Sequence, residues 1–230
     1  MSDANGPKTF LITGASSGIG AATARAAVAA GYRVALAARS ADKLAALADE
    51  LGTENAVAIA CNVTDFEAQK AMAAAALEAF GRIDVVLANA GLGSTAGGIE
   101  NGDPDNWREM ILTNIYGCAL TAKVCLPEVR KRKGHILLLG SRAGRRTIKG
   151  SIYGATKWAV TGLGNNLVEE LEGTGVRCTL IEPGMVDTPF FDTAKPDALR
   201  AEDVANVIMF AVSQPDHVDV SEILVKPISR

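Results

Sequence analysis

The sequence contains few of the residues that bind metal ions. It has four cysteines and two histidines in 230 residues. Cys61, Cys118, Cys125 and Cys178 are spread along the chain without any Cys-x2-Cys pair. A zinc site usually draws its thiolates and imidazoles from closely spaced pairs. We therefore expect no metal site, and we expect the cysteines within apolar runs to be small buried residues.

An excess of positive charge and long apolar runs are also missing. The formal net charge is -3, whereas nucleic-acid surfaces carry an excess of Lys and Arg. The one basic run, Arg130 to Lys133, is expected to end a helix favourably. No stretch approaches the roughly 18 apolar residues of a membrane span, and residues 1–7 do not resemble a signal peptide. We expect a cytoplasmic protein with a flexible N-terminus at 1–7 and no nucleic-acid or membrane partner.

Short apolar segments alternate with longer helical patterns along the rest of the chain. Strands are expected near 8–13, 32–38, 56–61, 83–88, 135–140, 176–182 and 221–226, and helices near 18–30, 41–51, 65–80, 104–133, 152–172 and 202–213. This alternation predicts one α/β domain over residues 8–230, with a parallel sheet covered on both faces. Ligands bind outside the strands' carboxyl ends in such sheets, so the loops 91–104 and 183–201 are candidate walls of a site.

A glycine-rich loop follows the first strand. Residues 13–20 read Thr-Gly-Ala-Ser-Ser-Gly-Ile-Gly and open an Ala-rich helix. The glycines allow the backbone to approach a pyrophosphate, and the helix N-terminus offers it free N–H groups. The spacing is Gly-x3-Gly-x-Gly instead of the common Gly-x-Gly-x2-Gly, and the alternative is a plain glycine turn. The expected cofactor contacts in this loop are Gly14, Ser16, Ser17, Gly18, Ile19 and Gly20.

The end of the second strand favours NADP(H) over NAD(H). An NAD enzyme usually has a carboxylate about 20 residues after the glycine loop, where it binds the ribose 2′-hydroxyl. This sequence has Arg39 instead, and a guanidinium suits the 2′-phosphate of NADP. The alternative is that Arg39 only caps a solvent-facing turn. Asn62 follows the third strand and either binds the adenine amino group or begins the turn at 62–65.

Tyr153 and Lys157 form a candidate acid–base pair. Residues four apart lie on one face of a helix, so the ammonium can favour the phenolate anion. Such a neighbour would lower the pKa of the phenol from about 10 toward the range useful for proton transfer near neutrality. The same spacing is common on helices, so this pair alone does not define an enzyme.

These motifs together resemble the short-chain dehydrogenase/reductase family over residues 8–228. The matching features are the glycine loop, Asn89-Ala90-Gly91, Asn114, Ser141, Tyr153-x3-Lys157 and Pro183 to Thr188, in that order. The resemblance implies a single Rossmann-like, doubly wound domain with a seven-stranded parallel sheet flanked by helices. It also implies an oxidoreductase that interconverts a ketone or aldehyde and an alcohol by hydride transfer with a nicotinamide cofactor.

The resemblance assigns a role to each catalytic residue. Tyr153 would be the general acid or base, and Lys157 would lower its pKa and bind the nicotinamide ribose. Ser141 would polarise the substrate oxygen, and Asn114 would hold a water that links Lys157 to solvent. Asn is mildly unfavourable inside a helix, although solvent exposure explains many such residues. The further cofactor contacts expected are Val63, Asn89, Ala90, Gly91, Pro183, Gly184, Val186 and Thr188.

The sequence gives fewer indications about the substrate-binding residues and the oligomeric state than about the cofactor site. The segment 184–201 contains Phe190 and Phe191, which suits a lid with an apolar inner face. We hypothesise that Arg145 pairs with a substrate carboxylate, the alternative being a solvated loop charge. A broad apolar stripe on the helix near 104–133 predicts a homodimer or homotetramer. The alternative to an enzyme is a nucleotide-binding regulator that has kept the fold without turnover.

Overall fold

The structure is a computed structural model that describes residues 6–228, so most of the segment 1–7 lies outside the described residues. Its centre is a seven-stranded parallel sheet in the order β3-β2-β1-β4-β5-β6-β9. The strands are β1 (Thr9–Thr13), β2 (Arg33–Ala38), β3 (Ala56–Ala60), β4 (Val85–Ala88), β5 (His135–Leu139), β6 (Arg177–Pro183) and β9 (Glu222–Val225). The seven strands expected from the apolar segments are thus confirmed.

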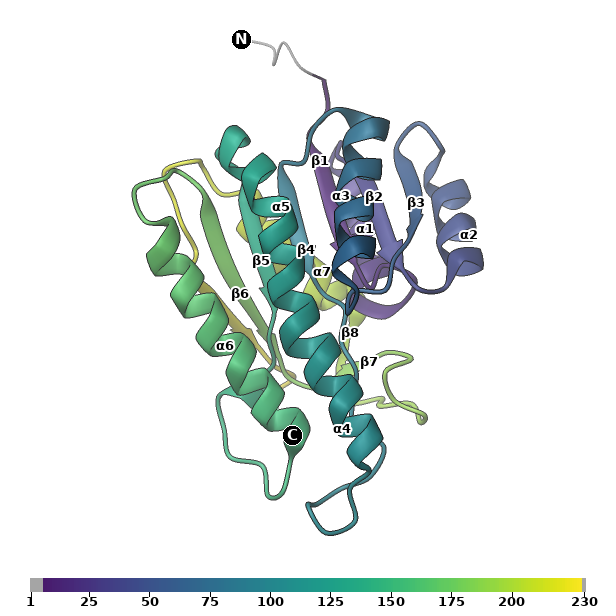
Figure 1. Cartoon of the computed structure of the whole chain (residues 1–230), viewed down its shortest axis with the longest axis vertical. Coiled ribbons are helices and arrows are strands. Elements are labelled where there is room, and N and C mark those ends of the chain that lie inside the picture. Colours follow the sequence, from purple (N-terminus) through teal and green to yellow (C-terminus); the bar gives the residue numbers. More distant parts are fainter. Residues whose placement is uncertain (1–5, 229–230) are drawn as a thin grey trace.

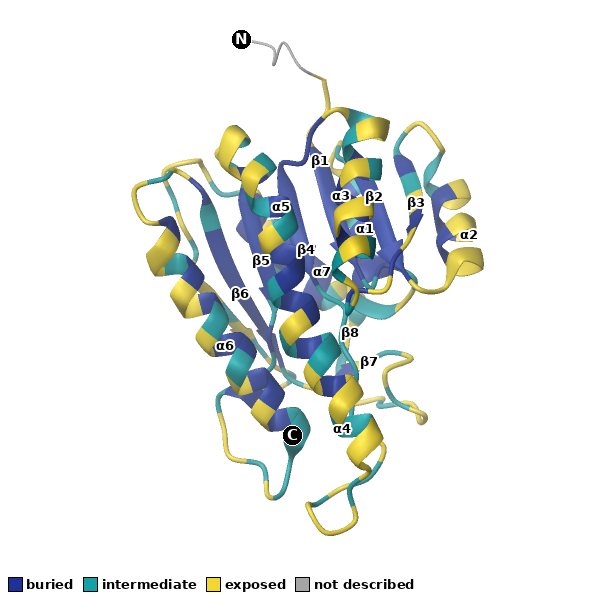
Figure 2. Ribbon diagram, in the orientation of Figure 1, coloured by how far each residue is buried: buried dark blue, intermediate teal, exposed yellow. Residues whose placement is uncertain are grey.

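Helices cover both faces of this sheet (Figure 1). On one face lie α1 (Gly18–Ala29), α2 (Ala41–Leu51) and α7 (Ala201–Val212), and on the other lie α3 (Phe66–Phe80), α5 (Cys118–Arg132) and α6 (Ile152–Leu171). Each face has its own apolar core, and the five inner strands between them are almost entirely buried, whereas the edge strands β3 and β9 are partly exposed (Figure 2). The central strands can therefore be apolar on both sides, as in a doubly wound fold.

The helix expected at 104–133 is not continuous α-helix. It consists of α4 (Pro104–Ile111), a π-helical segment at Leu112–Gly117 and then α5. Asp103 caps α4 by accepting a hydrogen bond from the Asp105 N–H at 3.0 Å. Within the described residues, this run is the one helix long and apolar enough to cross a membrane, but 44% of the relevant window is buried in the fold. That burial is typical of a core helix, so the run is weak evidence for a membrane span.

A short pair of strands was not expected from the sequence. β7 (Val186–Asp187) and β8 (Leu199–Arg200) pair in parallel as a separate two-stranded sheet. They join the two ends of the segment 184–201 that we interpreted as a lid. In Figure 1 this segment lies below the carboxyl ends of the main strands, beside α4. The lid is therefore anchored at both ends, with its aromatic residues between the anchors.

Candidate active site

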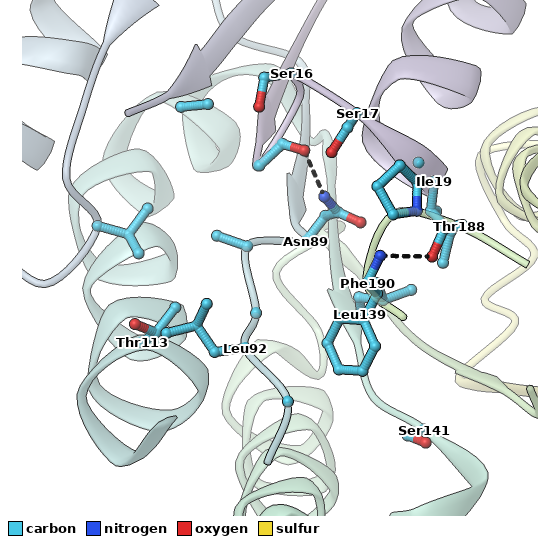
Figure 3. A pocket seen from close by; sticks show the side chains of 18 of the residues that line it. Ser16, Ser17, Ile19, Asn89, Leu92, Thr113, Leu139, Ser141, Thr188 and Phe190 are labelled. Atoms are coloured by element: carbon cyan, nitrogen blue, oxygen red, sulfur yellow. Dashed lines mark hydrogen bonds between the residues drawn. The ribbon is translucent and has the colours of Figure 1, made fainter. Parts of the chain in front are cut away.

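A cavity of about 590 Å³ runs along the carboxyl ends of the strands. Its walls include all the predicted catalytic and cofactor-binding residues except Gly20 and Asn114, and the hypothesised substrate contact Arg145 does not line it either. Ser16 and Ser17 lie at one end in the close-up and Ser141 at the other (Figure 3). The predicted residues that line it are Gly14, Ser16, Ser17, Gly18, Ile19, Arg39, Asn62, Val63, Asn89, Ala90, Gly91, Ser141, Tyr153, Lys157, Pro183, Gly184, Val186 and Thr188.

The glycine loop presents a helix N-terminus to this cavity. Gly14 and Gly18 have φ angles of +64° and +53°, which L side chains rarely adopt. α1 begins at Gly18, its N-cap Ser17 makes no side-chain cap, and its first turn holds no acidic residue. The first N–H groups of α1 are thus left for a ligand, and the positive end of the helix dipole favours an anion.

Asn89 braces the glycine loop from the neighbouring strand. Its side-chain amide donates hydrogen bonds to the carbonyl oxygens of Thr13 and Gly14 at 2.8 and 3.1 Å. The Thr13 hydroxyl in turn accepts hydrogen bonds from the backbone N–H groups of Asn89 and Ala90. These bonds hold the loops that follow β1 and β4 against each other at the floor of the cavity.

Arg39 and Asn62 flank the same end of the cavity. Arg39 is exposed and has no hydrogen-bond or ion-pair partner in the part of the chain that the structure describes. The Asn62 side-chain oxygen accepts hydrogen bonds from the backbone N–H and the hydroxyl of Thr64, at 3.2 and 3.0 Å. The turn expected at Asn62 is therefore present, and the contact of its side-chain oxygen with an adenine amino group stays a prediction.

Tyr153 and Lys157 project from the first turns of α6. Ser151 caps this helix by accepting a hydrogen bond from the Gly154 N–H at 2.9 Å. The Lys157 ammonium nitrogen lies 5.9 Å from the centre of the Tyr153 ring. It donates a hydrogen bond to the Leu139 carbonyl oxygen at 2.8 Å. The last residue of β5 therefore holds the lysine close to the tyrosine.

Burial shifts both titrating groups away from their charged forms. It lowers the pKa of Lys157 to about 8. It also raises the pKa of Tyr153, and hydrogen bonding with Ser141 opposes that rise. We expected the ammonium to lower the pKa of the phenol, but burial outweighs its neighbours and the net shift of the Tyr153 pKa is upward. The reason is that removing water from the site disfavours both the ammonium and the phenolate.

Ser141 lies where β5 ends and a short 3₁₀ turn, Arg142–Gly144, begins. Its hydroxyl oxygen accepts a hydrogen bond from the Ala143 N–H at 3.1 Å. Gly144 in this turn packs directly on α6, since a Cβ there would lie 2.6 Å from the Lys157 carbonyl oxygen. The turn that carries Ser141 is therefore held against the helix that carries Tyr153 and Lys157.

Asn114 is buried in the π-helical segment, with 1% of its surface exposed. Its side-chain oxygen accepts a hydrogen bond from the Leu92 N–H, and its amide donates to the Leu92 carbonyl oxygen and the Thr156 hydroxyl, at 2.8 to 3.0 Å. Solvent exposure thus does not explain this asparagine. Both amide hydrogens are used, so a bound water can meet the side chain only as a donor to its oxygen.

Arg145 is not available to a substrate carboxylate. Its Nε donates hydrogen bonds to both carboxylate oxygens of Glu182, at 2.9 and 2.8 Å, and a terminal nitrogen pairs with Glu222. Glu182 is fully buried. Neither of our interpretations of Arg145 is correct, because the side chain is neither a solvated charge nor a free cation at the cavity wall.

Aromatic residues of the lid cover the catalytic end. The ring of Phe190 lies 5.8 Å from the ring of Tyr153, and Phe191 packs edge-on against Phe190. Figure 3 shows Phe190 beside Leu139, between Thr188 and Ser141 in that view. Gly93 leaves room for this ring, since a Cβ there would lie 2.8 Å from it. Sequence reasoning pointed to both lid aromatics and to the loop that contains Leu92 and Gly93. It missed four other lining residues: Glu109, Leu112, Thr113 and Leu139.

Comparison with known proteins identifies the family of this chain. The family model for short chain dehydrogenases matches residues 8–199. An uncharacterized oxidoreductase of Staphylococcus haemolyticus is 38% identical, over 99% of this chain and 100% of that protein. The chain belongs to the short-chain dehydrogenase family, and it is an oxidoreductase of that family.

Two solved structures support the same assignment. An alcohol dehydrogenase from the archaeon Thermococcus sibiricus, complexed with 5-hydroxy-NADP, superposes with a TM-score of 0.89 at 33% identity, covering 96% of this chain and 97% of that one. A metagenomic short-chain oxidoreductase in complex with NADP gives a TM-score of 0.86 at 34% identity, covering 98% and 99%. Both similar structures therefore contain a nicotinamide cofactor or its derivative.

Proposed function

We propose that this protein is an NADP(H)-dependent carbonyl reductase or alcohol dehydrogenase in which Tyr153 is the general acid or base. The observation that carries the proposal is one continuous cavity with an anion-binding helix N-terminus at one end and Ser141, Tyr153 and Lys157 at the other. A dinucleotide fits this arrangement if its pyrophosphate binds at the helix N-terminus, its adenosine lies toward Arg39 and Asn62, and its reacting ring lies toward Tyr153.

The residues present fit such a cofactor. The positive φ angles of Gly14 and Gly18 and the uncapped start of α1 suit a pyrophosphate. Arg39 has no partner among residues 6–228 and faces the cavity where a 2′-phosphate requires a cation. Asn89, Ala90 and Gly91 would contact the adenosine ribose, and Pro183, Gly184, Val186 and Thr188 the nicotinamide amide. NAD(H) lacks the 2′-phosphate and would leave Arg39 unused.

Each catalytic residue then has a physical task. The nicotinamide ring, when bound, supplies or accepts the hydride. Tyr153 holds the proton at its phenolic oxygen, giving it to the substrate oxygen in reduction and taking it back in oxidation. Ser141 donates a hydrogen bond where negative charge develops on that oxygen. Lys157, whose ammonium nitrogen lies 5.9 Å from the centre of the Tyr153 ring, favours the phenolate when it is charged.

The lid favours apolar carbonyl compounds as substrates. Phe190, Phe191 and Leu92 line the cavity near Tyr153, and Arg145 is committed to carboxylates of the protein. The charged residue contributed by α4 is an acid, Glu109. A neutral ketone or aldehyde with an apolar substituent therefore fits better than a keto acid.

We further propose that the protein is a cytoplasmic homodimer or homotetramer. Ile111, Tyr116 and Trp158 expose 46 to 49% of their surfaces on the π-interrupted helix and on α6. A second copy of the chain would bury these large apolar side chains. The four thiols are all free and buried, which suits a reducing compartment. Light scattering at micromolar concentration tests the assembly, and a monomer would overturn it.

The function is tested by following NADPH absorbance over a panel of ketones, aldehydes and keto acids, with NADH in parallel. We expect turnover of apolar ketones or aldehydes with NADPH, and slower turnover of the matching keto acids. Cofactor binding without turnover of any compound would support a nucleotide-binding regulator instead. Faster turnover with NADH would overturn the assignment of Arg39.

A further inference from the structure

Four elements of the fold meet at the buried carboxylate of Glu182. Glu182 is the penultimate residue of β6 and is 0% exposed. It accepts hydrogen bonds from Arg145, which follows the turn of Ser141, and from the Thr161 hydroxyl of α6 at 2.8 Å. Arg145 also pairs with Glu222 at the start of β9. We call these four residues, Arg145, Thr161, Glu182 and Glu222, the arginine bridge.

Each member of the arginine bridge lies close in sequence to a part of the active site. Glu182 directly precedes Pro183 and Gly184, the proposed contacts of the nicotinamide amide. Arg145 lies four residues after Ser141. Thr161 lies one helical turn after Lys157, on the same face of α6. The bridge therefore links the backbone segments that carry the proton donor, the polarising hydroxyl and the nicotinamide contacts.

The electrostatics of the bridge depend on Arg145. Burial raises the pKa of Glu222, the neighbouring Glu182 raises it further, and Arg145 lowers it. The two carboxylates are thus like charges that the guanidinium holds together. Without it, Glu182 would be a buried anion that keeps the Thr161 hydroxyl as a donor but lies beside the like-charged Glu222, which is strongly unfavourable. The segments joined at Glu182 would then move apart, or Glu182 would take up a proton.

We propose that Arg145 is a positioning residue that holds the Ser141 turn and the Pro183–Gly184 turn in register, and so sets the place of the nicotinamide end of the cofactor. This inference rests on the proposed function and adds residues that do not touch the cofactor themselves. The glycine loop and Arg39 lie at the other end of the cavity, so the bridge should not affect binding of the adenosine end.

Isothermal titration calorimetry with two ligands tests binding at the two ends of the cavity separately, and it requires no catalytic turnover. NADP⁺ uses the whole cavity, whereas adenosine 2′,5′-bisphosphate lacks the nicotinamide half. For Arg145→Met we expect the Kd of NADP⁺ to rise about tenfold and the Kd of the bisphosphate to stay within about twofold of wild type. Arg146→Met is the matched control, because Arg146 is exposed and lies outside the bridge, and it should leave both values unchanged.

Two further variants separate positioning from loss of stability. Arg145→Lys keeps the charge and should recover part of the NADP⁺ affinity. The double variant Arg145→Met/Glu182→Gln removes the unpaired buried anion, so it should recover thermal stability relative to Arg145→Met without recovering NADP⁺ affinity. Equal weakening of both ligands in Arg145→Met, unchanged NADP⁺ binding, or full recovery of NADP⁺ affinity in the double variant would each overturn the inference.

Failure of the inference about Arg145 can be distinguished from failure of the proposed function. Wild-type protein that binds NADP⁺ but reduces no carbonyl compound would contradict the function, while the two-ligand comparison would still decide the role of Arg145. If the wild type prefers NAD⁺, the pair NAD⁺ and ADP makes the same comparison. Wild-type protein that binds neither dinucleotide would overturn both.

Discussion

The α-carbon of Gly20 packs directly beneath the carbonyl oxygen of Gly14, since a Cβ built at residue 20 would lie 2.4 Å from that oxygen. The same Cβ would lie 2.8 Å from the Asn89 amide nitrogen. Gly20 therefore does not line the cavity, and its role is to let α1 approach the loop that Asn89 braces. The third glycine of the motif is a packing requirement, as in other dinucleotide-binding loops.

Gly20→Ala is accordingly expected to be costly. The backbone atoms above residue 20 cannot yield without moving the loop, so we expect a loss of about 1–3 kcal/mol in the free energy of unfolding and weaker NADP⁺ binding. Gly162→Ala is the matched control, because a Cβ at this exposed helical position meets nothing within 4 Å. It should be neutral or stabilise by up to about 1 kcal/mol. Chemical denaturation of both variants checks this, and equal stabilities would refute the packing role.

Arg39→Asp tests the cofactor preference. The carboxylate would repel a 2′-phosphate and could accept a hydrogen bond from a 2′-hydroxyl, as the acid of NAD enzymes does. We expect the ratio of NADPH to NADH affinity to fall at least about tenfold. Arg146→Asp makes the same charge change outside the cavity and should leave the ratio unaltered. An unchanged ratio in Arg39→Asp would mean that the phosphate contact lies elsewhere.

Phe190→Ala tests the apolar wall at the catalytic end. The ring packs against Tyr153 and Phe191, so its loss removes contact area from bulky apolar substrates. We expect the KM of such a substrate to rise about tenfold while that of a small ketone changes little. Phe210→Ala removes an exposed ring on α7 and is the control. A uniform change for all substrates would argue against a specificity role for Phe190.

Because His135 is buried, it makes the folded protein less stable as the pH is lowered. It is 1% exposed, and burial lowers its pKa to about 3. The unfolded chain takes up this proton near pH 6.5, whereas the folded chain does not until about pH 3. The free energy of unfolding is therefore unaffected by protonation of His135 well above pH 6.5. Between pH 6.5 and about pH 3 it falls as the pH is lowered, by up to about 1.4 kcal/mol per pH unit.

Urea denaturation between pH 7 and pH 5 measures this slope. His135→Gln should reduce the dependence of the free energy of unfolding on pH, because glutamine does not titrate. His217→Gln replaces the exposed histidine near the C-terminus and should not. If both variants keep the wild-type slope, the acid sensitivity comes from carboxylates instead.

Local patterns predicted the sheet and most of the cavity. Apolar strands alternating with helices fix a parallel sheet, and its carboxyl ends bring the glycine loop, Asn89, Ser141 and Tyr153 together. The π-helical segment at Leu112–Gly117 was missed, because one extra residue in a turn barely alters the apolar period. β7 and β8 were missed because each has only two residues.

The partners of charged groups could not be predicted from local patterns. Arg145 pairs with residues 37 and 77 positions away, and nothing near residue 145 in the sequence indicates them. The expectation for Tyr153 and Lys157 considered their mutual attraction and omitted the cost of burial, which shifts both pKa values the other way. Such effects depend on tertiary packing, which residue spacing does not encode.

The central claim is that the phenol of Tyr153 transfers the proton, and Tyr153→Phe tests it most directly. The variant keeps the ring that packs against Phe190 and removes only the hydroxyl. With the best carbonyl substrate of the panel, NADPH oxidation should slow at least about a hundredfold, while NADP⁺ affinity and thermal stability stay near wild type. Turnover close to that of the wild type in this variant would contradict the proposed mechanism.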